Sequence, residues 1–210
     1  MEGLIFPQNL GLSFVRTAAY DVITEAHICK IIKEEFGTRY LRGSCISNES
    51  VVNGNEQIKC QEFMFRNILK NKNINSALEI GTSLGVGSLL LSHYANYLIT
   101  VDNMPRTEPL PLWSYFGVYP KIIYAVTQDL ATEKEYINTL DFDFAMLGLD
   151  SDYDSTKFLF NCIKRCGRVL FHNVIHDRFK KVISELPQEE VEFIGDSFAY
   201  WEKRDNGKFA

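Results

Sequence analysis

The sequence has 210 residues with 46% hydrophobic and 23% charged side chains, and its formal net charge at pH 7 is −5. This composition is typical of a globular domain, and the acidic balance gives no positive field of the kind that attracts nucleic acid. Five cysteines at irregular spacing, no secretory signal and no apolar stretch near the roughly 20 residues that span a bilayer lead us to expect a cytoplasmic protein without disulfides or a membrane partner.

The first 55 residues are expected to form an N-terminal helical extension, followed by the main domain at residues 56–210. Apolar residues recur at helical spacing over residues 20–37, and Gly37 is a typical helix stop. A second helix is expected over residues 56–73. The extension either covers a substrate or forms a homodimer contact, and the sequence leaves both open.

Short apolar runs alternate with helical patterns from residue 76 onward. Strands are expected at 76–80, 97–102, 121–126, 142–149 and 167–173, and helices at 86–94, 132–140, 154–166 and 176–186. This alternation predicts a doubly wound α/β fold, with a parallel sheet covered on both faces. Two further runs at 190–194 and 197–203 flank a "GD" pair and predict an antiparallel hairpin at the sheet edge. The expected sheet therefore has seven strands.

The segment "ALEIGTSLGVGS", residues 77–88, places three glycines between the first strand and the following helix. Glycine inside an element costs about 0.5–1 kcal/mol relative to alanine. The cluster therefore indicates either a plain tight turn or a backbone that a ligand approaches closely. Asp102 ends the second strand roughly 20 residues on, where an acid accepts hydrogen bonds from ribose hydroxyls. A turn or capping aspartate is the alternative for Asp102.

The spacing of the acid and the glycines indicates which nucleotide-like ligand would fit. The pattern E-x-G-x-x-x-G-x-G differs from the dinucleotide pattern G-x-G-x-x-G, and Glu79 stands two residues before the first glycine. This carboxylate would repel a pyrophosphate but suits an ammonium group, directly or through water. A cationic ligand with an amino acid and an adenosine therefore fits better than NAD.

Five blocks occur in the order "ALEIGTSLGVGS", "ITVDN", "AVTQDL", "FDFAMLGLDSDYD" and "GRVLFHNV". They resemble the class I S-adenosylmethionine-dependent methyltransferases, and most closely the small-molecule, O-methyltransferase-like branch. The resemblance covers roughly residues 56–203 and implies a Rossmann-like sheet, S-adenosylmethionine as cofactor and a small-molecule methyl acceptor. The cofactor-binding residues that it implies are Glu79, Gly81, Thr82, Ser83, Gly85, Gly87, Asp102, Asn103, Gln128 and Asp129. For Gln128 and Asp129, a polar helix cap is the alternative.

The chain departs from the metal-assisted relatives where they carry metal ligands. Gly148 stands at the end of the fourth strand in place of an aspartate, Ser151 replaces a histidine, and Asn173 replaces an aspartate after the fifth strand. Mg²⁺ and Ca²⁺ prefer several hard oxygen ligands. We therefore expect no tightly bound catalytic metal, although Asp152 and Asp154 would supply carboxylates if Mg²⁺ did bind.

The catalytic candidates are Asp150, His172 and Asn173, at the ends of the fourth and fifth strands. Asp150 and His172 are the general bases available there. A structural histidine bonded to a backbone carbonyl is the alternative for His172. The loop at residues 103–120 carries Trp113, Tyr115, Phe116 and Tyr119, which form an acceptor pocket or lid, or else bury against the body or a second subunit.

Two other functions compete with methyl transfer to a small molecule. The replacements at Gly148, Ser151 and Asn173 favour a protein that binds S-adenosylmethionine or S-adenosylhomocysteine without turnover. A nucleic-acid methyltransferase would need a basic face and an (N/D)PP(Y/F)-like signature at the end of the fourth strand, where "LGLD" stands instead.

Overall fold

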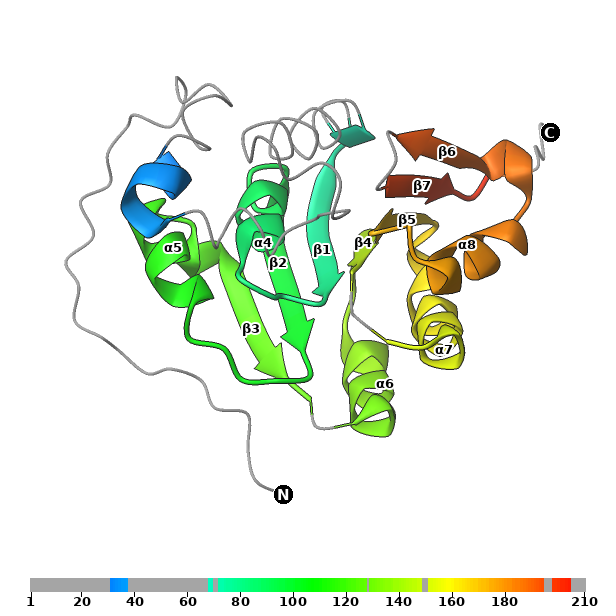
Figure 1. Cartoon of the computed structure of the whole chain (residues 1–210), viewed down its shortest axis with the longest axis horizontal. Coiled ribbons are helices and arrows are strands. Elements are labelled where there is room, and N and C mark those ends of the chain that lie inside the picture. Colours follow the sequence, from blue (N-terminus) through cyan, green and yellow to red (C-terminus); the bar gives the residue numbers. More distant parts are fainter. Residues whose placement is uncertain are drawn as a thin grey trace.

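The computed structural model describes residues 31–37, 68–69, 72–127, 129–148, 151–194 and 198–204. At its centre is a seven-stranded sheet with the strand order β3-β2-β1-β4-β5-β7-β6 (Figure 1). The strands are β1 (Ile74–Ile80), β2 (Ala95–Asp102), β3 (Ile122–Val126), β4 (Phe144–Leu147), β5 (Arg168–His172), β6 (Val191–Ile194) and β7 (Phe198–Glu202). Strands β1 to β5 are parallel, and β7 lies antiparallel between β5 and β6. The predicted doubly wound sheet with its terminal hairpin is confirmed.

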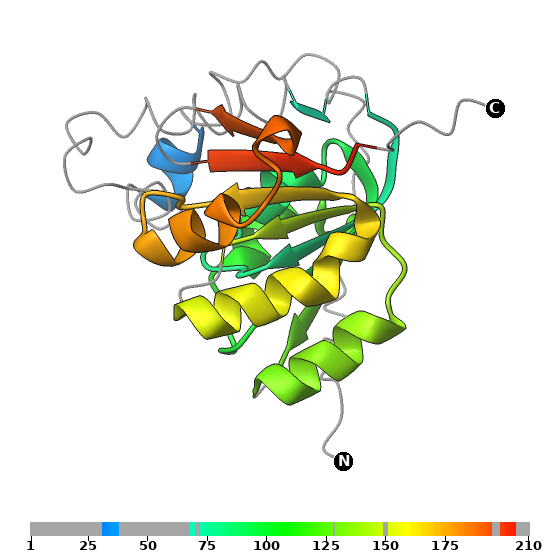
Figure 2. The ribbon, with the colours of Figure 1, turned by 90° about the vertical axis from the view of Figure 1, so that its right-hand side faces the viewer.

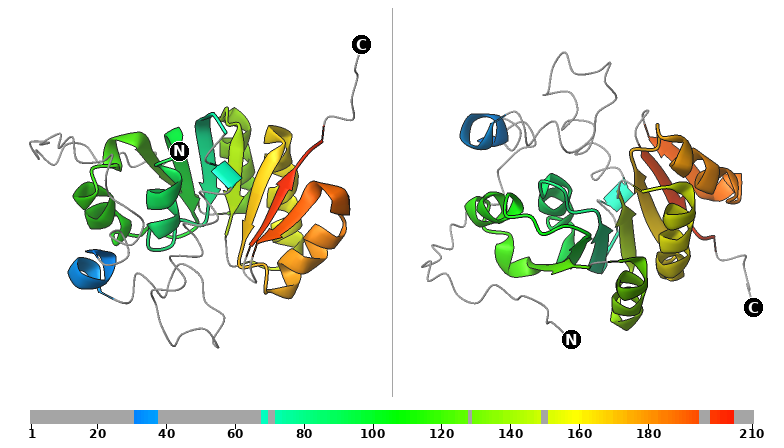
Figure 3. Two further views of the ribbon diagram at one scale, coloured as in Figure 1. Left: turned by 90° about the horizontal axis from the view of Figure 1, so that it is seen from above. Right: turned by 60° about the horizontal axis from the view of Figure 1, so that its bottom comes forward.

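Helices cover both faces of this sheet (Figures 2 and 3). One face carries α4 (Val86–Leu91) and α5 (Pro109–Tyr115), and the other carries α6 (Leu130–Thr139), α7 (Tyr153–Ile163) and α8 (Asp177–Ser184). Successive residues of a strand point to opposite faces, so a strand between two helical layers must be apolar on both sides. In β1, for example, Ala77 belongs to the core under α4 and Leu78 to the core under α7, and both are fully buried.

Short helical turns complete the described chain. The π-helix η2 (Ile32–Phe36) ends at Gly37, whose φ of +84° confirms the expected stop. The 3₁₀ turns are η3 (Tyr119–Lys121), η4 (Lys164–Cys166) and η5 (Gln188–Glu190). Of the helix expected at residues 56–73, the structure describes Ile68 and Leu69, which are helical and buried, and Lys72 and Asn73, which are not helical. The expected end at residue 73 is therefore wrong, because the chain leaves the helix before β1 begins at Ile74. The boundary expected after residue 55 lies outside the described residues.

The segment expected to be a loop at residues 103–120 contains the helix α5. Pro109 occupies its first position, where the missing N–H has no helical partner to lose. The prolines of this segment favoured the interpretation as a loop, although one of them begins a helix. Trp113, on this helix, is fully buried, and its burial against α4 holds α5 in place. No helix among the described residues is long and apolar enough to cross a membrane.

Candidate functional site

The carboxyl ends of β1, β2, β3 and β4 are tied together by backbone hydrogen bonds just beyond the strands. The Gly81 N–H donates to the Val101 carbonyl at 2.8 Å, the Gly148 N–H to the Ile80 carbonyl at 2.8 Å, and the Thr127 N–H to the Asp102 carbonyl at 3.0 Å. In an open parallel sheet, ligands bind beyond this edge. The structure therefore brings the glycine loop, Asp102 and the end of β4 to one edge, as the sequence predicted.

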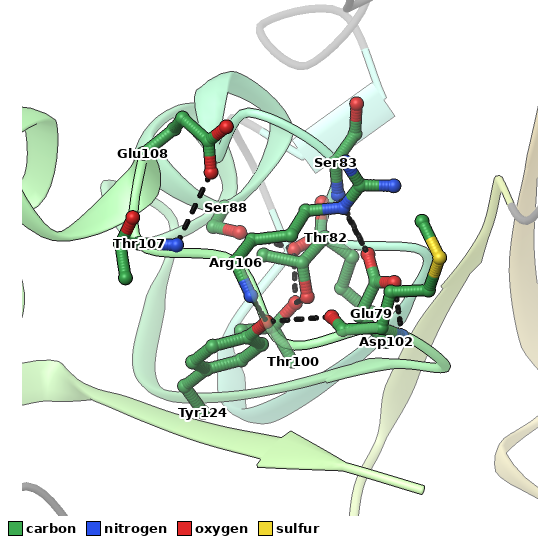
Figure 4. Close-up of polar contacts among 11 residues, drawn as sticks. Glu79, Thr82, Ser83, Ser88, Thr100, Asp102, Arg106, Thr107, Glu108 and Tyr124 are labelled. Carbon is green, nitrogen blue, oxygen red and sulfur yellow. Dashed lines mark hydrogen bonds and ion pairs between the residues drawn. The ribbon is translucent and has the colours of Figure 1, made fainter. Parts of the chain in front are cut away.

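A buried polar network lies under the glycine loop (Figure 4). Thr100, on β2, donates to Glu79 Oε2 at 2.6 Å, and Ser88, on α4, donates to the same oxygen. The hydroxyls of Thr82 and Thr100 are 2.6 Å apart, and Thr82 is the donor because the Thr100 proton is directed at Glu79. All four side chains are buried. The network fixes the loop to β1, β2 and α4.

Burial raises the pKa of Glu79 to about 7, against the lowering effect of the Ser88 and Thr100 hydrogen bonds, and the negative charge of Asp102 raises it further. Glu79 is only 1% exposed. Its carboxyl group supports the loop from below, and its contact with a ligand stays a prediction.

Internal packing explains two of the three glycines. A Cβ at Gly85, which has a φ of +82°, would lie 2.7 Å from Pro109 Cβ and 2.8 Å from Trp113 Nε1. The same indole donates to the Gly85 carbonyl at 2.9 Å. A Cβ at Gly87 would lie 2.5 Å from Glu79 Oε1. At these positions the protein itself fills the space for which the sequence suggested a ligand.

Two residues at the start of the loop also have a positive φ. Gly81 has a φ of +100°, and Ser83 has a φ of +50°, a conformation that non-glycine residues rarely adopt. This turn directs the Ser83 N–H toward Asp102, to which it donates at 3.0 Å. The Gly81 N–H donates to the Val101 carbonyl. Gly81 and Ser83 therefore both tie the start of the loop to the end of β2, on either side of the buried Thr82.

Asp102 is 2% exposed and accepts three hydrogen bonds (Figure 4). Besides Ser83, the Met104 N–H donates to Oδ1 at 3.0 Å and the Arg106 Nε–H donates to Oδ2 at 3.3 Å. The Tyr124 hydroxyl accepts from the Arg106 N–H at 2.9 Å and donates to the Met104 carbonyl at 3.1 Å. These are the contacts expected if Asp102 is a turn aspartate, which was the alternative interpretation. Its binding of a ribose stays a prediction.

The remaining predicted cofactor residues are placed only in part. Asn103 is exposed beside Asp102. Asp129 caps α6 by accepting from the Thr132 N–H at 2.8 Å, and this hydrogen bond lowers the pKa of its carboxyl group. Asp129 therefore has the helix-cap contact of the alternative. Gln128 and the catalytic candidate Asp150 lie outside the described residues.

Sequence reasoning missed Glu133, which is 3% exposed in the first turn of α6. Burial raises the pKa of its carboxyl group to about 7, and the negative charge of Asp102 contributes. The signal was the spacing to Ile137, four residues on and fully buried, which puts both residues on the same helix face. The hydroxyl of Thr127, after β3, is also buried and has no hydrogen-bond partner among the described residues.

The aromatic residues of 103–120 are divided between core and surface. Trp113 and Phe116 are buried against the body, as one alternative predicted, whereas Tyr115 is 55% exposed. The Tyr115 ring meets Phe36 edge-on at a centroid distance of 5.4 Å. The N-terminal segment therefore reaches α5.

The next residues to place are those at the positions where the metal-assisted relatives carry metal ligands. His172 ends β5 and is half-buried, and Asn173 follows it with a φ of +65°. Asp152 caps α7 by accepting from the Ser155 N–H at 2.8 Å. Within the described ranges, no group of three or more histidine, cysteine or acidic side chains is placed to hold a metal ion.

No family model and no curated protein sequence matches this chain. A putative caffeoyl-CoA O-methyltransferase from Staphylococcus aureus superposes with a TM-score of 0.60 at 13% identity, covering 84% of this chain and 92% of that one. The chain has a methyltransferase fold.

Two further solved structures agree. A putative O-methyltransferase from Klebsiella pneumoniae has a TM-score of 0.59 at 14% identity, covering 88% of this chain and 94% of its own. The N-methyltransferase NodS from Bradyrhizobium japonicum, in complex with S-adenosyl-L-homocysteine, has a TM-score of 0.52 at 15% identity, covering 71% of this chain and 88% of its own. At these identities the likeness establishes the methyltransferase fold, and the reaction must be argued from the site.

Proposed function

We propose that this protein transfers a methyl group from S-adenosylmethionine to a small-molecule acceptor. The observation that carries the proposal is the hydrogen bond between the Ser83 N–H and Asp102. It joins the two elements that the sequence resemblance assigns to the amino-acid part and to the ribose of the cofactor. The fold shared with methyltransferases supports the proposal, as does the S-adenosyl-L-homocysteine complex of NodS.

The residues at this edge fit such a cofactor. The Asp102 carboxylate would accept hydrogen bonds from the ribose hydroxyls, and the turn from Gly81 to Ser83 would hold the amino-acid part. Arg106 makes the longest of the three contacts to Asp102, at 3.3 Å, and is the partner that the ribose would replace. When bound, S-adenosylmethionine supplies a methyl group on a sulfonium, which is a good leaving group, so that positioning and exclusion of water are the protein's main tasks.

The partners and location follow as parts of the same proposal. The acceptor is a small molecule rather than a nucleic acid, because the chain is acidic overall. Ile32 and Phe36 pack on the core beside α5, which supports residues 1–55 as an extension that covers this side of the domain or contacts a second copy. Cys162 and Cys166 are free thiols, which suits a reducing, cytoplasmic compartment.

A second candidate is a protein that binds S-adenosylmethionine or S-adenosylhomocysteine without turnover. Gly148 favours it, because this residue supplies no side chain at the end of β4.

Calorimetric titration of S-adenosylmethionine and S-adenosylhomocysteine tests the proposal. The variants are Asp102→Asn and, as a matched control, Asp177→Asn, whose side chain is 99% exposed on α8. We expect micromolar binding that Asp102→Asn abolishes and Asp177→Asn retains. A folded wild-type protein that binds neither molecule would contradict both candidates. Binding without transfer of tritiated methyl to any phenol, amine or thiol of an acceptor panel would favour the second.

A further inference from the structure

The sheet has two edges, β3 and β6, and their sequences protect them differently (Figure 1). An edge strand exposes a row of unpaired backbone groups, which proteins commonly shield with charged side chains or proline. β6 carries Glu192 at its second position and follows directly on Glu189 and Glu190. β3, with the sequence IIYAV, has no charged residue and no proline. The β3 edge therefore lacks the charges that keep β6 from pairing with another chain.

Apolar side chains are exposed on both faces of the sheet at the β3 edge. Ile123 is 46% exposed, and it lies on the face that carries α6 and α7, because it pairs with Ile99 of that core. Tyr97, two residues before Ile99 on the same face, is 59% exposed. Val126 is 42% exposed on the opposite face, which it shares with Tyr124. A strand added beside β3 would therefore cover apolar surface on both faces.

The direction of the backbone groups decides which residues of β3 can pair outward. The Thr127 N–H donates to the Asp102 carbonyl of β2, and alternate residues of a strand direct their N–H and C=O groups to opposite sides. The groups of Ile122, Tyr124 and Val126 are therefore directed away from β2. The Ile122 N–H closes the preceding turn η3. Within the described part of the chain β3 pairs with β2 alone, so the Tyr124 and Val126 N–H groups have no strand partner there.

The charges that flank β3 favour an antiparallel partner. Lys121 directly precedes the strand and Asp129 follows it, and both are exposed. Two copies related by a two-fold axis pair their edges antiparallel, which brings Lys121 of each copy toward Asp129 of the other. At β6 the same operation would bring the Glu192 side chains of two copies into one short pair of strands, where like charges repel. The β3 edge is thus complementary to a second copy of itself, and the β6 edge is not.

We propose that β3 is the interface between two copies of this chain, which pair antiparallel about a two-fold axis at Tyr124 and form one continuous sheet. The Tyr124 N–H of each copy then donates to the Tyr124 carbonyl of the other, and each Val126 N–H donates to the Ile122 carbonyl of the other. Ile123 lies opposite Ala125 of the second copy. Because the interface is symmetric, each substitution in it acts twice. This inference does not rest on the proposed function.

Sedimentation velocity of the full chain over a dilution series tests the interface. We expect the wild-type protein to sediment with twice the chain mass of 24.1 kDa at micromolar concentration. Ile123→Lys should raise the dissociation constant of the dimer more than about tenfold, because each dimer would then bury two like charges. The matched control is Phe193→Lys, at a position 57% exposed on β6, which should leave the constant unchanged. A wild-type monomer, a dimer that Ile123→Lys does not weaken, or a larger assembly would overturn the inference.

Amide hydrogen exchange of the same samples tests the register. The Tyr124 and Val126 N–H groups should exchange slowly in the dimer and faster on dilution or in Ile123→Lys, whereas the Thr127 N–H, which is bonded to β2, should not change. Loss of Thr127 protection would reveal unfolding of Ile123→Lys, and Tyr97→Lys, at the exposed position on β2, then replaces it. A dimer that leaves Tyr124 and Val126 unprotected has another interface and would contradict the inference.

Discussion

The guanidinium of Arg106 lies on the carboxylate of Asp102, with Nε 3.3 Å from Oδ2. Asp102 is the residue proposed to bind the ribose, so Arg106 and a ribose would compete for the same oxygen. The side chain of Asp102 is 3% exposed and that of Arg106 is 30% exposed. The arginine is therefore the partner that can move.

Replacing Arg106 should strengthen cofactor binding. In Arg106→Met the competing charge is lost and the chain length is kept, and we expect the affinity for S-adenosylhomocysteine to rise about two- to fivefold, the range of a partly exposed ion pair. Calorimetry measures the effect, and Arg204→Met, at an exposed position, is the control. Weaker binding in Arg106→Met would show instead that the arginine contacts the ligand.

Glu79 should make the protein less stable as the pH rises. Its pKa is raised from 4.5 to about 7 in the folded protein, so the folded state holds a proton that the unfolded state has lost. The contribution of Glu79 to the free energy of unfolding is therefore greatest below about pH 4.5, and it falls until the pH passes about 7. We expect Glu79→Gln to flatten this part of the pH profile of the free energy of unfolding, measured with urea. An unchanged slope in Glu79→Gln, with exposed Glu135→Gln as control, would contradict the assignment.

Glu133 should be replaceable by an apolar residue with a gain in stability. Its carboxyl group is buried beside the negative charge of Asp102, and a buried charge without a compensating partner is destabilising. We expect Glu133→Leu to raise the free energy of unfolding above pH 7 by about 1–2 kcal/mol, with a smaller gain under acidic conditions. Glu135→Leu, on the exposed face of α6, should show no such pH-dependent gain. Equal effects of the two variants would exclude this explanation.

Gly85→Ala should destabilise the protein more than the same change at a glycine with free space. Both Gly85 and Gly167 have a positive φ, but a Cβ at Gly85 would overlap Pro109 and Trp113, whereas at Gly167 the nearest atom is 3.9 Å away. We expect a loss of about 1 kcal/mol for Gly167→Ala and about 2–4 kcal/mol for Gly85→Ala, since overpacking adds to the backbone cost. Urea denaturation measures both losses. Equal losses would show that α5 moves aside at little cost.

The fold could be predicted because its signals are local. Short apolar runs alternating with helical patterns predict a parallel sheet covered by helices, and the "GD" pair predicted the hairpin that closes its edge. Asp102 and the glycine loop could be assigned to one edge of the sheet for the same reason, since parallel strands end together.

What could not be predicted depends on contacts between distant segments. A side chain at Gly85 would overlap Pro109 and Trp113, and one at Gly148 would press on His172. Neither pair has a sequence spacing that a periodicity reveals. The Arg106 contact with Asp102 was missed because it lies in a segment interpreted as a loop, where no regular structure fixes which side chain turns back.

The indole of Trp113 joins the glycine loop to a larger cooperative unit. Its hydrogen bond to the Gly85 carbonyl links the start of α4 to α5, and Tyr115, on the same helix, meets Phe36 in η2. A ligand that rigidifies the glycine loop should therefore also slow amide hydrogen exchange across α5 and η2. The exchange rates of η2 would then report on an event at the glycine loop, across α5.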